Sequence, residues 1–418
     1  MNILIIGGGG REHAIAQALL QDERVEKLWC APGNGGIAQI AECLPYKATD
    51  LEGIVAFCKE SRPDLVVVAP DDPLALGLVD ELEAIGIRAF GPNKAAAVIE
   101  GSKSFAKDLM KKYKIPTAKY RVFDDLQKAR KYICAQGAPI VVKADGLALG
   151  KGVTVAQTVD EALEAAKSAL SGHVFGAAGD RVVIEECLTG PEVSVLCFTD
   201  GRCIRPMVSA QDHKRAYDND EGPNTGGMGA VSPNKYYTDE LAARCMEEIF
   251  EPTAAAMAAE GRPFKGVLYF GLMLTPDGPK VIEYNARFGD PETQAVLPLL
   301  QTSLLEIMEA IIDERLEAVD IRWENAHTAC VVAASGGYPG KYKTGYEIFG
   351  LDDVKRDGAL VCHAGTKYKD GWFYTAGGRV LSVTAKADTL DKAIARAYAS
   401  VDRVRFTDMF TRRDIGRR

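Results

Sequence analysis

The chain lacks any long apolar run. No stretch of its 418 residues reaches the roughly 18–20 consecutive apolar residues that a transmembrane helix needs. It also lacks a basic segment followed by an apolar one at its N-terminus, where a predicted strand begins directly at Ile3, so no export signal is expected. We therefore expect a cytoplasmic protein with no membrane partner.

The chain also lacks an excess of positive charge, and it contains no Cys-x-x-Cys pair. The formal net charge is −8 and the isoelectric point is near 5.4, which argues against a general nucleic-acid binder. The ten cysteines are scattered, and several lie in apolar segments, namely Cys187, Cys197, Cys203 and Cys330. We interpret them as reduced core residues rather than disulfides or metal ligands. The five histidines show no ligand spacing either.

No internal repeat or low-complexity linker interrupts the chain, and its length suggests several domains, each with its own core. Residues 1–100 alternate between strand and helix signals. The expected strands are 3–6, 27–30, 65–69 and 89–90, and the expected helices are 12–20, 51–60 and 74–85. This alternation predicts a doubly wound parallel sheet.

After residue 100 the expected strands pair through turns instead. Hairpins are predicted at 139–156, 192–209 and 266–285, because their central residues are those that hairpin turns use. Helices are expected at 102–113, 124–136, 160–170, 238–260, 302–314 and 388–400. We divide the chain into an N-terminal α/β unit (1–100), a central unit (101–327) with a small inserted unit near 118–189, and a β-rich C-terminal unit (328–418).

One expected strand carries the strongest functional signal. Glu283, Asn285 and Arg287 occupy alternate positions on it and therefore share one face. A carboxylate and an amide oxygen are hard ligands that suit Mg²⁺, and a planar guanidinium suits a carboxylate or a phosphate. An amphipathic surface strand would show the same alternation, but the turn that follows adds Asp290 and Glu292 beside this face. The segment predicts a magnesium–nucleotide site.

A glycine-rich loop, residues 7–10, follows the first expected strand and opens a helix. Backbone N–H groups at a helix N-terminus attract anions. A dinucleotide site is rejected, because His13 stands in place of the third glycine and the second strand ends in Cys30 and Ala31 rather than in an acid. We favour a substrate phosphate over a purely structural turn. The glycine-rich segment 32–36 would lie beside this loop.

A second glycine-rich segment runs from Lys143 to Gly152. It differs from a P-loop, because Gly152 replaces the Ser or Thr that would hold Mg²⁺ and the segment lies between two antiparallel strands. We interpret it as a hairpin lid whose amides and Lys151 close over phosphates. Two interpretations of Lys143 stay open: its side chain faces a ligand, or it is a solvated residue at the edge of the sheet.

The apolar strand that ends at Glu185–Leu188 leads into a turn between two units. Its backbone could meet an adenine edge, and Glu192 could accept hydrogen bonds from ribose hydroxyls. An ordinary acidic strand terminus remains the alternative.

Together these segments resemble the ATP-grasp superfamily and, within it, the phosphoribosylamine–glycine ligase (glycinamide ribonucleotide synthetase) family. The resemblance covers nearly the whole chain, and its most specific part runs from Arg287 to Leu297. Supporting segments are 7–13, 90–92, 101–103, 212–217, 222–229 and 336–340. One departure is Asp71, which stands where the family usually has the glutamate of Gly-Pro-Glu.

The resemblance implies a pre-ATP-grasp sheet, an ATP-grasp fold with an inserted lid, and a β-rich C-terminal domain. It implies a carbon–nitrogen ligase that uses ATP and Mg²⁺ or Mn²⁺ to join glycine to 5-phosphoribosylamine through glycyl phosphate, in de novo purine synthesis. It places ATP contacts at Lys103, Lys143, Glu185, Glu186, Cys187, Leu188, Glu192, Arg215 and Asn224, and the interpretation of the hairpin as a lid adds Gly150, Lys151 and Gly152. It places the phosphoribosylamine at Gly9, Gly10, Arg11, Glu12, Asn34, Gly35 and Asp71.

The remaining implied roles concern the metal and the glycine. Glu283 and Asn285 would hold the metal, and Arg287 would contact the glycine carboxylate and the reacting γ-phosphate. Asp212, with Asp290 or Glu292, would bind the glycine ammonium.

Three alternatives stay open at this point. Another ATP-grasp ligase, such as a carboxylase component or a formate-using purine enzyme, would depend on bicarbonate or formate. A nicotinamide-dependent oxidoreductase is disfavoured by Cys30 and Ala31. A nucleotide sensor would not need Arg287 and the two following acids beside the metal pair. We expect a monomer that acts on small molecules and, since the chain ends at Arg418, a stand-alone ligase.

Overall fold

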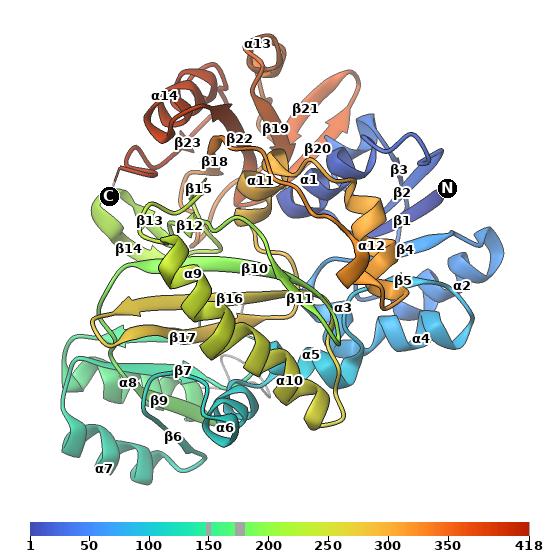
Figure 1. The fold of residues 1–418 in the computed structure, drawn as a ribbon. Helices are drawn as coiled ribbons and strands as arrows, with labels where there is room; N and C mark the ends of the chain where they lie inside the picture. The colour runs from blue at the N-terminus through green and yellow to red at the C-terminus, as the bar shows by residue number, and fades with distance from the viewer. Residues whose placement is uncertain (148–151, 172–179, 418) are drawn as a thin grey trace.

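The computed structural model describes residues 1–147, 152–171 and 180–417. The N-terminal segment forms a five-stranded sheet in the order β3-β2-β1-β4-β5, and every neighbouring pair is parallel (Figure 1). Its strands are β1 (Asn2–Gly7), β2 (Lys27–Pro32), β3 (Glu42–Cys43), β4 (Leu65–Val68) and β5 (Ala89–Phe90). Its helices are α1 (Gly10–Leu19), α2 (Leu51–Ser61), α3 (Asp71–Leu76), α4 (Leu78–Ala84) and α5 (Lys94–Gly101). The predicted doubly wound sheet is confirmed.

Two details of this segment differ from expectation. The helix expected at 74–85 is divided, because Gly77 adopts the left-handed conformation (φ +97°) that ends α3. Helix α5 was not predicted. The side chain of Asn93 caps it by accepting a hydrogen bond from the backbone of Ala96 at 2.9 Å.

The small unit at residues 120–186 has a four-stranded antiparallel sheet in the order β6-β9-β7-β8. Its elements are β6 (Tyr120–Phe123), α7 (Leu126–Gln136), β7 (Ile140–Ala144), β8 (Val153–Ala156), α8 (Val159–Ser171) and β9 (Val182–Glu186). The two helices pack on the sheet around a separate hydrophobic core that includes Ile133, Val142 and Ile184. This unit forms the lower lobe in Figure 1.

The central sheet is antiparallel, in the order β11-β10-β16-β17. Its strands are β10 (Glu192–Asp200), β11 (Ile204–Pro206), β16 (Lys265–Thr275) and β17 (Gly278–Asn285). The helices around it are α6 (Lys103–Tyr113), α9 (Asp239–Cys245), α10 (Glu251–Ala259), α11 (Glu292–Val296) and α12 (Leu304–Ile312). All three expected hairpins form. The helix expected at 238–260 comprises α9, a π-helical turn and α10, and Phe250 and Met257 are buried in the core.

The C-terminal sheet has the order β12-β15-β18-β22-β19, with β23 on β18. Its strands are β12 (Gln211–Asp212), β15 (Gly229–Ser232), β18 (His327–Ser335), β19 (Leu360–His363), β22 (Arg379–Ala387) and β23 (Met409–Phe410). Helix α14 (Leu390–Val401) packs against β18 and β22. The other elements are β13 (Arg215–Tyr217), β14 (Glu221–Asn224), α13 (Leu351–Arg356), β20 (Thr366–Lys369) and β21 (Trp372–Thr375). Because β12 and β15 precede residue 328, this sheet crosses the expected unit boundary.

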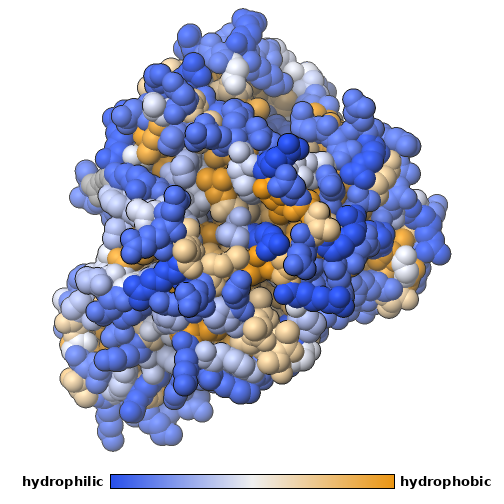
Figure 2. Space-filling model, in the orientation of Figure 1, coloured by the Kyte–Doolittle hydropathy of each residue, from blue (hydrophilic) through white to orange (hydrophobic). Residues whose placement is uncertain are grey.

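The surface is mainly hydrophilic on the face shown in Figure 2, and hydrophobic residues appear there only in small areas. The outline is indented between the lobe that carries α7 and α8 and the part that carries β13 and β14 (Figures 1 and 2). Among the helices in the described ranges, none combines the length and the apolar character that a membrane crossing requires. The ten cysteines are all free thiols. Cys197 and Cys330 are buried, but Cys187 and Cys203 are only half-buried and Cys134 is exposed, so the interpretation of these three as core residues is wrong.

Candidate active site

Glu283 and Asn285 lie on one face of β17, near its end. They pair with Gly271 and Tyr269 of β16, two positions apart. An added Cβ at Gly271 would lie 2.9 Å from Cγ of Glu283, so the glycine leaves room for this side chain. Lys214 Nζ contacts Glu283 Oε1 at 2.8 Å. Its charge, opposed by burial, lowers the pKa of Glu283 to about 2, so the carboxylate stays anionic.

These two residues fit a divalent cation. An anionic carboxylate and an amide oxygen on one strand face are the oxygen donors that Mg²⁺ accepts, usually together with substrate phosphates and water. The described residues contain no group of three or more His, Cys, Asp or Glu side chains arranged as a metal site.

Glu185, at the end of β9, lies between two lysines. It is only 3% exposed, and its carboxylate contacts Lys143 Nζ at 3.1 Å and Lys107 Nζ at 2.9 Å. Lys143 also donates a hydrogen bond to the carbonyl of Ile282 at 2.7 Å, which connects β7 to β17. Burial, opposed by the charge of Glu185, lowers the pKa of Lys107 to about 8. Lys143 is thus an inward-facing residue rather than a solvated edge lysine.

Lys103 begins α6 and reaches the start of the glycine-rich hairpin. Its Nζ donates to the carbonyl of Gly146 at 2.9 Å, and its backbone N–H donates to the carbonyl of Asp145 at 2.8 Å. Gly152 is buried at the other end of the hairpin. Gly150 and Lys151, also predicted to contact the nucleotide, lie outside the described residues.

The other predicted nucleotide residues occupy two places. Glu186 accepts a hydrogen bond from the backbone of Lys119 at 2.9 Å, so its carboxylate joins β9 to β6, and Cys187 and Leu188 follow it. Arg215 and Asn224 pair across β13 and β14. Lys214, directly before β13, links these places, because it contacts Glu283 and lies 3.8 Å from exposed Glu192.

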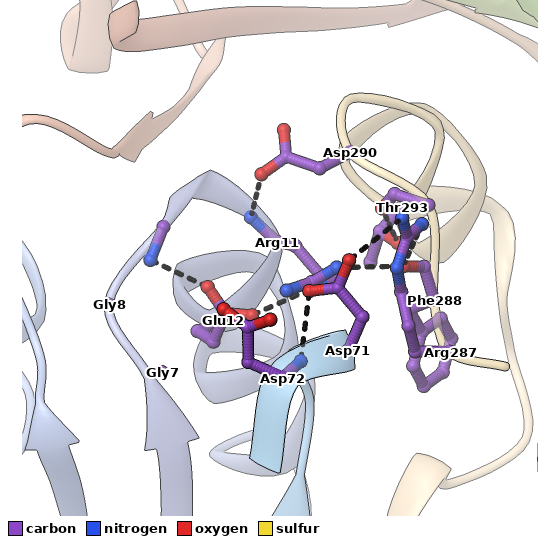
Figure 3. A network of polar contacts seen from close by, with 12 residues as sticks. Gly7, Gly8, Arg11, Glu12, Asp71, Asp72, Arg287, Phe288, Asp290 and Thr293 are labelled. Atoms are coloured by element: carbon purple, nitrogen blue, oxygen red, sulfur yellow. Dashed lines mark hydrogen bonds and ion pairs between the residues drawn. The ribbon is translucent and has the colours of Figure 1, made fainter. Parts of the chain in front are cut away.

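Arg287 was expected on the same strand as Glu283 and Asn285, but this strand, β17, ends at Asn285. The reason is that Glu100 accepts the next backbone N–H, that of Ala286, at 2.7 Å. The guanidinium of Arg287 contacts Glu100 at 3.0 Å and lies 4.0 Å from Asp71 (Figure 3). Its Nε is buried and has no hydrogen-bond partner among the described residues. This donor remains available for a ligand.

The first glycine loop is held by the polar side chains of the two residues that follow it, Arg11 and Glu12 (Figure 3). Glu12 accepts the backbone N–H of Gly9 at 2.6 Å and contacts Arg11 Nε at 2.6 Å. Arg11 also donates to the carbonyl of Phe288 at 3.1 Å, and its backbone N–H donates to Asp290 at 3.3 Å. The loop, the helix N-terminus that begins at Gly10, and the segment after β17 therefore form one unit.

Asn34 joins this loop to the C-terminal sheet. Its amide donates to the carbonyls of Gly8 at 3.0 Å and His363 at 2.7 Å, and its oxygen accepts the backbone N–H groups of Gly36 and Ile37. The neighbouring Gly35 donates its backbone N–H to Thr366. In this structure the side chain of Asn34 thus positions the loop, and its predicted contact with a substrate stays a prediction.

Asp212, Asp290 and Glu292 gather at the turn after Arg287. Burial raises the pKa of Asp212 well above its ordinary value, with a further contribution from the charge of Glu292. Asp212 Oδ1 is buried and has no partner among the described residues. Glu292 is 4% exposed and accepts a hydrogen bond from Ser194 at 3.3 Å. The half-buried Asp212, with a free buried oxygen, and the buried Glu292 beside it favour a cationic ligand.

Known family patterns match almost all of this chain. The model of the phosphoribosylglycinamide synthetase ATP-grasp (A) domain matches residues 101–293, that of the N domain matches 1–100, and that of the C domain matches 328–418. The chain belongs to the phosphoribosylglycinamide synthetase family.

Full-length relatives agree with membership of this family. A phosphoribosylamine–glycine ligase of Brucella melitensis is 51% identical over 100% of this chain and 97% of its own length. One from Caldanaerobacter subterraneus is 48% identical over 99% of each chain. The crystal structure of the Thermotoga maritima enzyme has 33% identity and a TM-score of 0.87, and covers 100% of both chains. A Campylobacter jejuni biotin carboxylase, at 15% identity, TM-score 0.75 and coverage of 98% and 93%, shares the fold.

Four charged residues that contact the predicted site residues were not identified from the sequence. Lys107 follows Lys103 by four residues on α6, so helical spacing would have placed both on one face. Glu100, Lys214 and Arg379 gave no such signal, because their partners Arg287, Glu283 and Asp290 are far away in the sequence.

Gly8→Ala is expected to destabilise the protein. A Cβ at this position would lie 2.4 Å from the carbonyl oxygen of Gly33, where the two glycine loops meet. Because both groups belong to backbone, relief requires separating the loops, at a cost of about 1–3 kcal/mol. Urea unfolding should show this loss. Gly101→Ala is the matched control, since no atom lies within 4 Å of its Cβ position, and equal stability of the two variants would contradict the prediction.

Glu100 is expected to make folding stability depend on pH. Burial, opposed by the charge of Arg287, raises the pKa of Glu100 from 4.5 to about 7. The folded state therefore holds the proton more tightly than the unfolded state, so Glu100 costs stability above pH 7, and this cost fades as pH falls from 7 toward 4.5. The full cost is roughly 3 kcal/mol. The free energy of unfolding of the wild type minus that of Glu100→Gln should rise by about 2–3 kcal/mol from about pH 8 to about pH 5.

The comparison uses urea unfolding at each pH, so that contributions from other groups cancel between the two proteins. Glu26→Gln serves as the control, because the side chain of Glu26 is 80% exposed. A difference that stays flat with pH, as for Glu26, would show that Glu100 does not titrate in this window.

Proposed function

We propose that this chain joins glycine to 5-phosphoribosylamine at the expense of ATP, giving glycinamide ribonucleotide, ADP and phosphate in de novo purine synthesis. The observation that carries the proposal is the position of Arg287. It comes just after β17, which carries Glu283, and directly before Phe288, whose carbonyl accepts a hydrogen bond from Arg11 beside the first glycine loop, and it has a buried donor still free. A nucleotide on one side and a phosphorylated amine on the other would both reach it.

The chemistry has two steps. The carboxylate of glycine is a poor electrophile, so its oxygen first attacks the γ-phosphorus of ATP, which releases ADP and forms glycyl phosphate. The amine of phosphoribosylamine then attacks the acyl carbon, the amine gives up a proton, and phosphate leaves. The first step depends mainly on positioning and charge neutralisation, and the acyl phosphate must be shielded from water.

On the nucleotide side, Lys103 and Lys143 contact the phosphates, and Lys107 holds Glu185 in place beside Lys143. The backbone from Glu185 to Leu188 meets the adenine, Glu192 accepts from the ribose, and Arg215 and Asn224 close the site. The hairpin residues Gly150, Lys151 and Gly152 cover the phosphates. Glu283 and Asn285 would hold Mg²⁺, or Mn²⁺ in its place, and this cation would neutralise phosphate charge.

On the acceptor side, the amides of Gly9 and Gly10 at the start of α1 receive the ribose phosphate. Arg11, Glu12, Asn34, Gly35 and Asp71 complete this subsite. Arg287 contacts the glycine carboxylate and the γ-phosphate. Asp212 binds the glycine ammonium together with Glu292 or Asp290, supported by the unpartnered oxygen of Asp212.

We further propose a three-unit organisation (1–100, 101–327 and 328–418), with a lid near 118–189 and a monomer in the cytoplasm without nucleic-acid or membrane partners. The separate core of the lid sheet supports the lid as a unit of its own. The ten free cysteines support a reducing compartment. Light scattering after size-exclusion chromatography tests the monomer.

The experiment for the function is phosphate release from ATP and Mg²⁺ with freshly generated phosphoribosylamine, with and without glycine. Release that needs both substrates, with the coupled product identified by mass spectrometry, is the expected result. Replacement of glycine by bicarbonate or formate would overturn the assignment while keeping an ATP-grasp ligase. ATP binding without any turnover would favour a sensor instead.

A further inference from the structure

Arg379, the first residue of β22, reaches out of the C-terminal sheet into the acid cluster of Asp212, Asp290 and Glu292. Its Nη1 donates to the carbonyl oxygens of Gly226 at 2.6 Å and Asp290 at 2.9 Å, and lies 3.3 Å from the carbonyl of Gly227. The same nitrogen lies 3.3 Å from the carboxylate of Asp290. One guanidinium thus joins the loop 226–227 to the turn at 290.

The loop held in this way lies directly against the acids. Gly227 has φ +108°, and a Cβ there would lie 2.3 Å from Pro291 and 2.7 Å from Asp212 Oδ1. The position therefore accepts only glycine, and the loop passes next to the unpartnered oxygen of Asp212. A shift of the loop would change the space around that oxygen.

The charge of Arg379 acts on the same groups. Burial alone would raise the pKa of Asp290, but the guanidinium groups of Arg379 and Arg11 bring it below its ordinary value. Arg379 also favours the anionic form of Asp212, against the effect of burial and of Glu292. Arg379 makes no contact of its own with the predicted nucleotide residues that the structure describes.

We propose that Arg379 is a positioning residue that sets the affinity of the site for glycine. It fixes the loop 226–227 over Asp212 and against the turn at Asp290, so that the acid cluster keeps the arrangement that binds the substrate ammonium. This inference rests on the proposed function and adds the C-terminal sheet to the glycine subsite, whereas the ATP subsite is independent of this residue.

The test compares Arg379→Met, Arg379→Lys and Arg396→Ala with the wild type in the glycine-dependent assay. Loss of charged hydrogen bonds in Arg379→Met should raise KM for glycine roughly 10-fold to 100-fold, with KM for ATP unchanged. Arg379→Lys should recover part of the loss, because an ammonium can reach some of the same carbonyls. Arg396, which donates to the carbonyl of Lys386 at 3.1 Å, is the control arginine from the C-terminal part of the chain.

An unchanged KM for glycine in Arg379→Met, or an equal rise of KM for ATP, would overturn the proposal. Thermal melting shows whether Arg379→Met folds. If it does not fold, the test depends on Arg379→Lys alone, and a KM for glycine equal to that of the wild type would then overturn the proposal. Failure of the wild type to use glycine would instead refute the proposed function, so the two failures are distinguishable.

Discussion

Replacing Glu283 by alanine is expected to lower turnover by at least about 100-fold. Losing ~3 kcal/mol of the stabilisation that the metal gives to the transition state lowers the rate by roughly two orders of magnitude. The carboxylate is held anionic by Lys214 at 2.8 Å and faces the same side of β17 as Asn285. Without it, the site keeps an amide oxygen and a lysine whose remaining acidic neighbour, Glu192, lies 3.8 Å away, so the lysine repels a cation. The concentration of Mg²⁺ needed for half-maximal turnover should rise as well.

The control must separate metal binding from the loss of the ion pair. Lys214→Met breaks the same pair but leaves the carboxylate, so it should retain Mg²⁺ dependence close to that of the wild type. Urea unfolding shows whether both variants fold. Near-normal turnover in a folded Glu283→Ala protein would remove Glu283 from the metal role.

Local sequence signals predicted most of the framework around this site. The turn residues of the hairpin that ends in Glu283 and Asn285 fix its pairing, and alternation then places both side chains on one face. The parallel sheet followed from short apolar strands separated by helical periodicity. Such signals depend on residues that are close together in the sequence, so they can be recognised without knowledge of the tertiary structure.

Signals that depend on distant contacts were not available. The end of β17 at Asn285 is set by Glu100, which lies on a helix 186 residues away from its partner Ala286 in the sequence. The strands β12 and β15 have two and four residues, too few for a clear alternation; β12 pairs with β15, and β15 pairs with β18. Arg379 reaches the site only because this pairing carries the C-terminal sheet to it.

Arg287→Met is expected to reduce kcat by about 100-fold to 1,000-fold, the loss seen when a donor that stabilises transition-state charge is removed. The fold should tolerate it. Glu100 would lose its partner at 3.0 Å, but a buried carboxyl that already has a raised pKa becomes neutral rather than remaining an unpaired charge. Arg244→Met, which removes an exposed arginine paired with Glu248 at 2.8 Å, is the control.

Arg287→Lys distinguishes charge from geometry. A lysine keeps the positive charge but has no counterpart of the guanidinium Nε, the buried donor left without a partner among the described residues. If this donor binds the glycine carboxylate or the γ-phosphate, Arg287→Lys should stay within about 10-fold of Arg287→Met. Activity close to that of the wild type would mean that charge alone is needed at this position, and that the planar fork between Glu100 and Asp71 serves the structure rather than the reaction.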